Sequence, residues 1–324
     1  MKPTPTKYKS GLGLIGQMLG QERLVIDRDI HGRTCFHSHF GACPRLGDGP
    51  WIAHRGWIEA LSLRPLSASL QSILAQTAVH HHGRQFSVGR LELQSSSSGI
   101  PFGGSLLQMR LSNSSLRCVY GYALGKAAQA MVCDWLVLDL NSRWAHNLSS
   151  QPSLKPLHAQ GIETLLALGA RMLCLTRTVV EARQFSTTLP GSLTLTGHPR
   201  FSPYLDMHQS LAKAQLVLWP MDSLQSPILR KQPFDILFLM NPTEIEKQQA
   251  EKWAESLNVK EVVSIANPDH MDPNAFLKFW TACGEPIILL RGETQWLKPT
   301  EGWFRDQGIE VCSHNDGVQL GLFQ

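Results

Sequence analysis

The chain has 324 residues, of which 43% are hydrophobic and 17% are charged, and its formal net charge is +4. This length and composition allow one large α/β domain or two smaller lobes, and they exclude collagen, coiled coil and wholesale disorder. The mild basic excess is compatible with a polyanionic partner and equally with an ordinary soluble surface. Seven cysteines at wide spacings, without a C-x-x-C pair, argue against a disulfide framework and favour a reducing compartment.

No apolar run approaches the roughly 18 residues that a membrane-spanning helix requires. The apolar stretch at residues 12–19 is short and interrupted by glycine, which does not fit a signal peptide. We therefore expect a cytoplasmic protein without a membrane partner.

The first half of the chain predicts short strands, because alternating or apolar segments are bounded there by Gly, Ser or Asn. These predicted strands cover residues 24–27, 86–93, 105–111 and 116–120. Residues 112–115 predict a hairpin turn, and residues 95–98 predict a small polar turn. Residues 134–140 form a continuous apolar run, which is typical of a strand buried on both faces.

From about residue 150 the pattern changes to helices that alternate with strands. The predicted helices cover residues 157–168, 179–189, 242–251 and 274–283, and the predicted strands cover residues 171–176, 235–240, 259–265 and 286–290. This alternation indicates a layered α/β fold.

A histidine-containing segment lies downstream of the first predicted strand: His37-Ser38-His39-Phe40-Gly41-Ala42. Two histidines spaced by one residue are typical of metal-hydrolase motifs. Together with His31, Cys35 and Cys43 they form a local His/Cys cluster, so a replacement structural zinc site stays open as an alternative. The tract His80-His81-His82 is interpreted as a polar loop between a helix and a strand.

The order of several short motifs, spanning roughly residues 11 to 324, resembles the β-CASP branch of the metallo-β-lactamase superfamily. Residues 37–42 resemble the family motif His-x-His-x-Asp-His, with Gly41 and Ala42 in the last two ligand positions. The family's Gly-His-x-x-Gly-Ser loop is resembled by Ser98-Gly99-Ile100-Pro101-Phe102-Gly103-Gly104-Ser105, and its Thr-Gly-Asp ending by Val119-Tyr120-Gly121-Tyr122. Its strand with an acidic end is resembled by Asp134-Trp135-Leu136-Val137-Leu138-Asp139, and its Ser-x-His-x-Asp turn by Asp269-His270-Met271-Asp272. Its Val-His-Gly-Glu strand is resembled by Ile287-Ile288-Leu289-Leu290-Arg291-Gly292-Glu293.

The resemblance implies an α/β fold, namely a metallo-β-lactamase-like αββα sandwich with an inserted β-CASP-like α/β lobe. The sandwich would comprise residues 11–150 and 262–324, and the lobe residues 151–261. Members of this branch are nucleases of DNA repair and RNA processing, including bacterial ligase- and helicase-associated exonucleases and mRNA 3′-end processing factors. Their two zinc ions activate water for attack on a phosphodiester.

Most of the implied metal ligands are replaced in this chain. The replacing residues are Gly41, Ala42, Ile100, Tyr122 and Arg291. His37 and His39 are the metal candidates that stay, but a catalytic zinc takes three protein ligands and a water. Arg291 opposes a nearby cation and suits a phosphate. We therefore expect a pseudoenzyme without a cofactor, and zinc only if the metal site has been rebuilt.

Asp139 and His270 stand where the family has an acid–base pair, and we name them as vestigial catalytic candidates. Asp139 would alternatively cap the turn that follows it. Several cations fall in the expected lobe or the cleft that it faces, where they would follow a nucleic-acid backbone. These are Arg177, Arg183, Arg200, Lys231 and Arg291.

The leading hypothesis is a catalytically degenerate β-CASP-like protein that binds DNA or RNA, or scaffolds a helicase, a ligase or an intact homologous nuclease. One alternative is an active metal-dependent 3′- or 5′-exonuclease with a rebuilt zinc site. The other is a protein-interaction subunit without a nucleic-acid role.

Overall fold

The computed structural model describes residues 24–27, 32–40, 50–63, 65–140, 155–156, 159–189, 193–207, 210–240, 242, 244–266, 270–292 and 294–315. Over these residues the chain is an α/β protein with parallel and mixed sheets. It divides into two compact units, residues 1–150 with 271–324 and residues 151–270. We expected the second lobe to end at residue 261. That boundary is too early, because a strand over Glu261–Ala266 pairs within the second unit's sheet.

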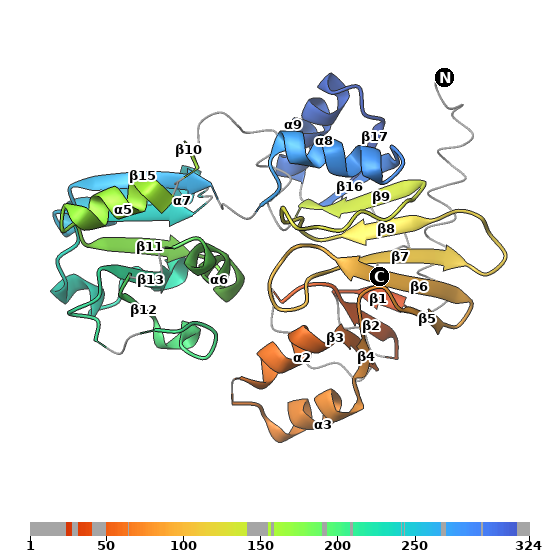
Figure 1. Cartoon of the computed structure of the whole chain (residues 1–324), viewed down its shortest axis with the longest axis horizontal. Coiled ribbons are helices and arrows are strands. Elements are labelled where there is room, and N and C mark those ends of the chain that lie inside the picture. The colour runs from red at the N-terminus through yellow and green to blue at the C-terminus, as the bar shows by residue number, and fades with distance from the viewer. Residues whose placement is uncertain are drawn as a thin grey trace. The chain divides into compact units, whose positions relative to one another are not determined.

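The first unit contains two sheets, labelled in Figure 1. The smaller sheet is parallel throughout, in the order β1 (Leu24–Ile26), β2 (Thr34–His37), β3 (Trp51–His54) and β4 (Ala78–His80). The larger sheet has the order β17 (Val311–Asn315), β16 (Ile287–Gly292), β9 (Trp135–Asp139), β8 (Cys118–Gly121), β7 (Ser105–Leu111), β6 (Leu91–Ser97) and β5 (Gln85–Val88). Strands β5 to β8 are antiparallel neighbours, whereas β8, β9, β16 and β17 run parallel.

One hydrophobic core joins the two sheets face to face. Phe36 of the smaller sheet belongs to the same buried cluster as Tyr120, Val137 and Leu289 of the larger one. Because side chains alternate along a strand, the neighbours of these residues point away from this shared core. His37, next to Phe36, is one of them and therefore lies on the outer face of the smaller sheet.

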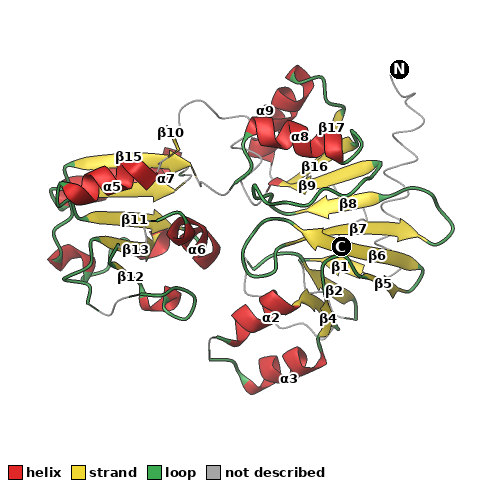
Figure 2. Ribbon diagram, viewed as in Figure 1, coloured by secondary structure: helices red, strands yellow, loops and turns green. Residues whose placement is uncertain are grey.

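Helices flank the two sheets, as Figure 2 shows. They are α2 (Arg55–Ser62), α3 (Ala68–Gln76), α8 (Pro273–Ala282) and α9 (Thr294–Asp306). The first two contact β3, and α9 contacts β16 and β17. Asp272 begins α8, because its carboxylate accepts a hydrogen bond from the Ala275 N–H at 2.8 Å and Pro273 follows in the first turn.

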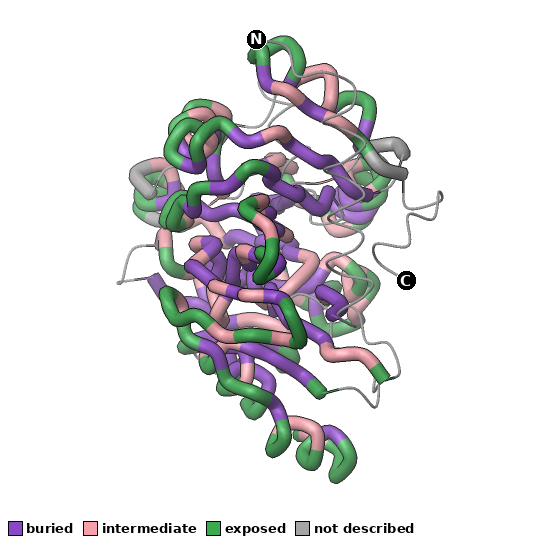
Figure 3. The backbone as a smooth tube through the Cα atoms, turned by 90° about the vertical axis from the view of Figure 1, so that its right-hand side faces the viewer, coloured by how far each residue is buried: buried purple, intermediate pink, exposed green. Residues whose placement is uncertain are grey.

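The second unit is built on one parallel sheet. Its strands lie in the order β10 (Lys155–Pro156), β15 (Glu261–Ala266), β14 (Ile236–Met240), β11 (Met172–Thr176), β13 (Leu216–Pro220) and β12 (Leu195–Gly197). Helices α5 (Ala159–Ala167), α6 (Val179–Thr187) and α7 (Glu244–Ser256) alternate with them. Trp253 of α7 packs in one cluster with Leu173 and Leu237, so α7 covers one face of the sheet. Figure 3 shows that the buried stretches of the chain follow the strands.

Most of the predicted elements are confirmed, including residues 105–111 as β7 and the buried strands β9, β11 and β14. The prediction of one strand over residues 86–93 with a polar turn at 95–98 is wrong. Gly89, with φ of 57°, turns the chain after β5, and β6 then continues through the serines to Ser97. The polar-loop interpretation is also wrong for His80, which ends β4 and is buried.

The loop over residues 98–104 is held by a close backbone approach to the segment after β8. The Gly125 N–H donates to the Ser98 carbonyl oxygen at 2.8 Å. A side chain at Gly125 would overlap the Gly99 carbonyl. In α9, by contrast, a Cβ at Gly302 would meet nothing within 4 Å.

We expect Gly125→Ala to lower the free energy of unfolding by about 2 kcal/mol, because backbone must move to admit the methyl group. Gly302→Ala is the matched control, and its higher helix propensity should leave stability equal or raise it by up to about 1 kcal/mol. Urea unfolding of the two variants beside the wild type measures both changes. Equal stability of the two variants would show that the loop does not need this close approach.

Candidate functional site

Polar side chains gather where parallel strands of the first unit end. Asp27 directly follows β1, and His39 lies two residues after the end of β2. Asp139 is the last residue of β9, and Arg291 is the next-to-last residue of β16. Carboxyl ends of parallel strands meet at one edge of a sheet, and in α/β folds that edge is the usual position of a functional site.

Strand register places Asp139 and Arg291 side by side in the larger sheet, close to a third polar residue, Tyr120. In the parallel pairing of β9 with β16, Asp139 is the direct partner of Arg291. Tyr120 of β8 is the partner of Val137, two residues before Asp139. Because Tyr120, Val137 and Leu289 all face the core, Asp139 and Arg291 must face it as well.

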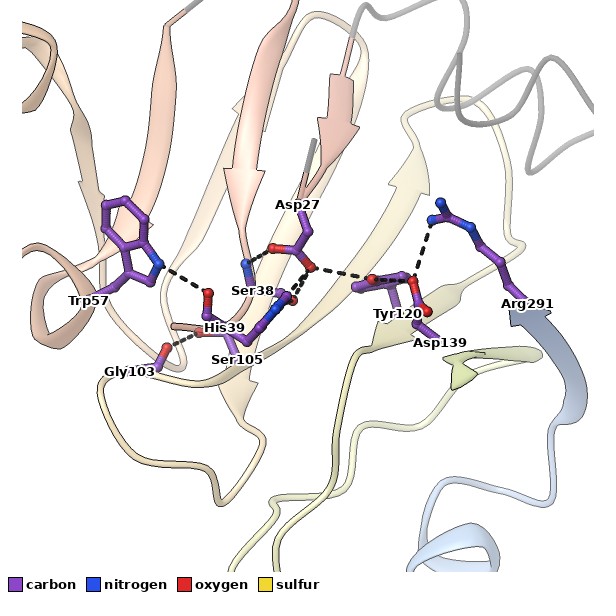
Figure 4. A network of polar contacts seen from close by, with 9 residues as sticks. All are labelled: Asp27, Ser38, His39, Trp57, Gly103, Ser105, Tyr120, Asp139 and Arg291. Atoms are coloured by element: carbon purple, nitrogen blue, oxygen red, sulfur yellow. Dashed lines mark hydrogen bonds and ion pairs between the residues drawn. The ribbon is translucent and has the colours of Figure 1, made fainter. Parts of the chain in front are cut away.

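These residues form one buried chain of contacts, drawn in Figure 4. The Tyr120 hydroxyl lies 3.2 Å from Asp139 Oδ2 and 3.3 Å from Asp27 Oδ2. Its single proton goes to one carboxylate at a time. Arg291 Nη1 forms an ion pair with Asp139 Oδ2 at 3.6 Å, and His39 Nδ1 lies 3.2 Å from Asp27 Oδ2. Each carboxylate therefore has its own cationic or imidazole partner, and the phenol lies between them.

Ser38 completes the environment of Asp27. Its backbone N–H donates to Asp27 Oδ1 at 2.7 Å, and its hydroxyl donates to Asp27 Oδ2. Asp27 itself adopts φ of 55°, a left-handed conformation that Asp tolerates better than most residues. Trp57 Nε1 donates to the His39 carbonyl at 3.1 Å and so fixes the backbone after β2.

Burial and neighbouring charges determine the protonation states of Asp27 and Tyr120. Burial alone would raise the pKa of Asp27, but the charge of His39 and the hydrogen bonds from His39 and Ser38 outweigh it and lower this pKa. Burial, and then the charges of Asp139 and Asp27, raise the pKa of the Tyr120 phenol well above its ordinary value. Asp27 is thus an acceptor and Tyr120 a donor across the neutral pH range.

The two histidines of the expected metal motif have different surroundings. The His37 ring stacks on Trp57 with centroids 4.5 Å apart and meets Trp51 edge-on at 4.8 Å. Burial lowers its pKa to about 4, and its Nε2 has no hydrogen-bond partner among the described residues. The His39 ring instead stacks on Tyr122, with centroids 3.3 Å apart.

The residues present do not fit the two-zinc centre that the resemblance implies. Tyr122 covers one face of His39, Arg291 brings a cation to Asp139, and apolar Ile100 is buried where a third histidine was expected. Over the described part of the chain, no three His, Cys, Asp or Glu side chains are grouped as metal ligands. Gly41, Ala42, His31 and Cys43 lie outside the described residues, so the alternative His/Cys zinc site is not assembled within them.

The expected acid–base pair is divided between the two units. Asp139 belongs to the first unit, where it accepts from Tyr120 and pairs with Arg291, whereas the turn that it would cap lies outside the described residues. His270 belongs to the second unit, where burial and then the charge of Arg177 lower its pKa to about 4. A neutral imidazole beside an arginine is a poor general acid at pH 7.

Three of the five cations expected to bind nucleic acid are engaged with carboxylates. Arg177 pairs with Glu246 at 2.8 Å and with Glu181 at 3.3 Å. Burial would lower the pKa of Arg177, but these two carboxylates outweigh it and raise it. The other pairs are Arg200 with Asp222 at 2.8 Å and the buried Arg291 with Asp139. Arg183 donates to the Tyr204 carbonyl at 3.4 Å, and Lys231 is exposed.

A hollow of about 320 Å³ lies at the carboxyl ends of β11, β13 and β14 in the second unit. Such positions commonly receive ligands in α/β sheets. Its charged lining consists of Arg177, Asp222 and Glu246, so acidic groups outnumber the cation. This balance does not favour a phosphate in this hollow.

A second histidine cluster, missed in the sequence, lies at the ends of β3 and β4. The rings of His54 and His82 stack with centroids 4.2 Å apart, and His80 lies 5.5 Å from His54. His80 Nδ1 is 2.8 Å from the Ser95 hydroxyl, while its buried Nε2 has no partner among the described residues. Burial, and then the neighbouring imidazoles, lower the pKa of His80 to about 3 and that of His82 to about 4.

No family model matches the chain, and no curated protein sequence is significantly similar to it. Across the described residues, no helix combines the length and the apolar content needed to cross a membrane.

Removal of Arg291 tests whether the buried ion pair is needed. We expect Arg291→Met to lower the free energy of unfolding by about 3–5 kcal/mol, because the Asp139 carboxylate loses its buried cation. Asp139→Leu in the same chain should recover part of that loss, since no charge is then left buried. Arg305→Met is the control: its pair with Glu301 is largely exposed, with 64% of the Arg305 side chain accessible, and should cost less than about 1 kcal/mol. An equal cost for both single variants would contradict this account.

His80 should make the first unit sensitive to acid. Its pKa is about 3 in the folded chain and 6.5 as the ordinary value, so the unfolded chain takes up the proton first as the pH falls. Stability is therefore full above pH 6.5 and declines below it, by about 2 kcal/mol at pH 5 from this residue alone. His80→Phe keeps the ring stack on Phe36 and Phe86 and should remove that share of the decline. The measurement is urea unfolding at pH 8 and pH 5, and an unchanged decline in the variant would refute the assignment.

Proposed function

We propose that the chain is a catalytically inactive, metallo-β-lactamase-like protein of β-CASP type that acts by binding nucleic acid or a nucleic-acid-processing partner. The arrangement of the first unit supports this class, because two sheets share one core and helices flank them. The second α/β unit, residues 151–270, is inserted between two parts of the first. This is the order expected of an αββα sandwich with an inserted lobe.

One observation carries the proposal that the protein does not hydrolyse phosphodiesters. Tyr120, Asp139 and Arg291 form a buried polar chain at the strand ends where the family would place metal ligands. The Arg291 side chain is only 2% exposed, and its fixed positive charge opposes a metal cation at Asp139. A two-metal mechanism needs vacant coordination positions and a metal-bound water there. Here Arg291 instead forms an ion pair with Asp139, and the Tyr120 hydroxyl lies between Asp139 and Asp27.

The distribution of charge indicates which unit would attract a polyanion. The second unit contains eleven Lys and Arg residues and eleven Asp and Glu residues, so the net charge of +4 resides in the first unit. Exposed cations of the first unit include Arg84, Lys126, Lys278 and Lys298. We therefore place the proposed nucleic-acid contact mainly on the first unit, whereas the sequence alone had pointed to the lobe.

Two measurements on the wild-type chain test the two halves of this proposal. Protein purified without chelator or histidine tag should contain less than about 0.1 equivalents of zinc, and should leave labelled DNA and RNA uncut with added Zn²⁺ or Mn²⁺. One or two equivalents of zinc with cleavage would instead establish the rebuilt exonuclease.

Binding of fluorescent single-stranded DNA and RNA, followed by anisotropy, tests the second half. Between 50 and 200 mM salt we expect affinity to fall by roughly tenfold or more, as about three phosphate contacts require. The double variant Lys278→Glu, Lys298→Glu should weaken binding further than Lys231→Glu does, because the first two belong to the basic unit. Absent or salt-insensitive binding would reject a nucleic-acid role and leave the protein-interaction subunit.

A further inference from the structure

Two cysteines of the first unit, far apart in the chain, are held together at its edge. Cys133 lies just before β9, and Cys283 is the residue that ends α8. The Cys133 N–H donates to the Cys283 carbonyl oxygen at 2.9 Å. Such a direct backbone bond is compatible with the Cα separation of about 4.4–6.8 Å that a disulfide spans. The residues beside them are close as well, because a Cβ at Gly284 would lie 3.4 Å from Val132 Cγ1, and each thiol shifts the pKa of the other.

The two thiols differ in acidity because each acts on the other. The hydrogen bond from the Cys133 thiol, helped by the Met131 backbone, lowers the pKa of Cys283. The same contact, and then burial, raise the pKa of Cys133. Cys283 is therefore the nucleophile of the pair, since the thiolate is the reactive form. Cys118 and Cys174 differ, because burial raises their pKa values, to about 12 for Cys118.

Both sulfurs lie just below the surface. Cys133 is 4% exposed and Cys283 is fully covered, but their neighbours Val132 and Gly284 are exposed. Opening of two short surface segments would admit a small oxidant, and local opening of this kind costs far less than global unfolding. A large oxidising protein has no such access to the pair.

We propose that Cys133 and Cys283 form a reversible intramolecular disulfide when the protein meets a peroxide. The Cys283 thiolate attacks one peroxide oxygen, the O–O bond breaks, and a sulfenic acid and hydroxide result. Sulfur of Cys133 then attacks the Cys283 sulfur, the S–O bond breaks, and water leaves. In sum, two thiols and one hydrogen peroxide give one disulfide and two waters. A thiol reductant such as glutathione reverses the reaction by exchange.

The consequence concerns the inserted unit. All of residues 151–270 lie between the two cysteines in the sequence. The bond would therefore close a loop that contains the whole second unit, and would tie the chain segment that leads out of the first unit to the one that returns. A crosslink around so long a loop removes much freedom from the unfolded chain. The proposal stands independently of whether the protein binds nucleic acid.

The test uses wild-type protein, first reduced, then treated with a few equivalents of hydrogen peroxide and blocked with N-ethylmaleimide. Intact mass spectrometry should show a species that carries two fewer maleimide groups than the reduced, blocked protein, and its polypeptide mass without these groups should be about 2 Da lower. Digestion without reductant should yield a linked pair of peptides that contain Cys133 and Cys283. The oxidised form should melt about 5 °C higher, and dithiothreitol should abolish the shift.

Variants separate this pair from the other cysteines. Cys283→Ser and Cys133→Ser should each prevent the lighter species, whereas Cys174→Ser, which alters another buried cysteine, should leave it intact. A linked pair of other cysteines, or oxygen atoms added to a single cysteine without any loss of mass, would overturn the proposal. The peptide map of the wild type decides the matter even if a serine variant fails to fold.

Discussion

The buried chain from Asp27 through Tyr120 to Asp139 and Arg291 joins the two sheets of the first unit. Asp27 follows a strand of the smaller sheet, and the other three groups belong to the larger sheet. Carboxylates placed in an apolar core cost several kcal/mol each unless hydrogen bonds and opposite charges surround them. Here Arg291 supplies a positive charge at Asp139, the His39 imidazole lies against Asp27, and Tyr120 and Ser38 supply hydrogen bonds. The network is therefore stable only as a whole, and its geometry holds the strand ends in place.

Parallel strand pairing determines which groups belong to that network. Asp139 and Arg291 are separated by about 150 residues of sequence, but the register of β9 with β16 makes them direct neighbours. Alternation along each strand then turns both side chains toward the core that Tyr120 also faces. A shift of that register by one residue would turn Arg291 outward and leave Asp139 opposite Leu290 or Gly292.

How far the sequence predicts the structure depends on how local each signal is. The apolar run over residues 134–140, which forms β9, and the helix over residues 274–283, which forms α8, were predicted because neighbouring residues carry the pattern. The β5–β6 hairpin was missed, although Gly89 in the middle of the run was a usable signal for a turn. His80 looked like a loop residue because its burial depends on Ser95 and Phe36, which other strands supply.

Prediction of the candidate site from the sequence was limited in the same way, because its contacts come from distant parts of the chain. Asp139, Arg291 and His39 were singled out by resemblance, and the structure brings them into one network. Asp27 and Tyr120, which connect them, were not predicted as site residues, although Tyr120 lies in a segment that resembles a family motif. A tyrosine in a strand is most often core, and only the approach of two carboxylates to its hydroxyl gives it another role. The surroundings of Arg177 were equally hidden, since Glu246 comes from a helix 69 residues further along the chain.

A metal centre and a buried polar network can each hold the ends of neighbouring strands together. A metal ion binds side chains from several loops through one central charge, and its loss leaves carboxylates without a counter-ion. In this chain a guanidinium provides a positive charge at Asp139, and His39 has the Tyr122 ring on one face and the Asp27 carboxylate at its Nδ1. A buried carboxylate without a counter-ion is strongly unfavourable, so Arg291 at Asp139 is needed for a stable arrangement. Arg291, Asp139, Tyr120 and Asp27 therefore hold these strand ends through their own charges and hydrogen bonds.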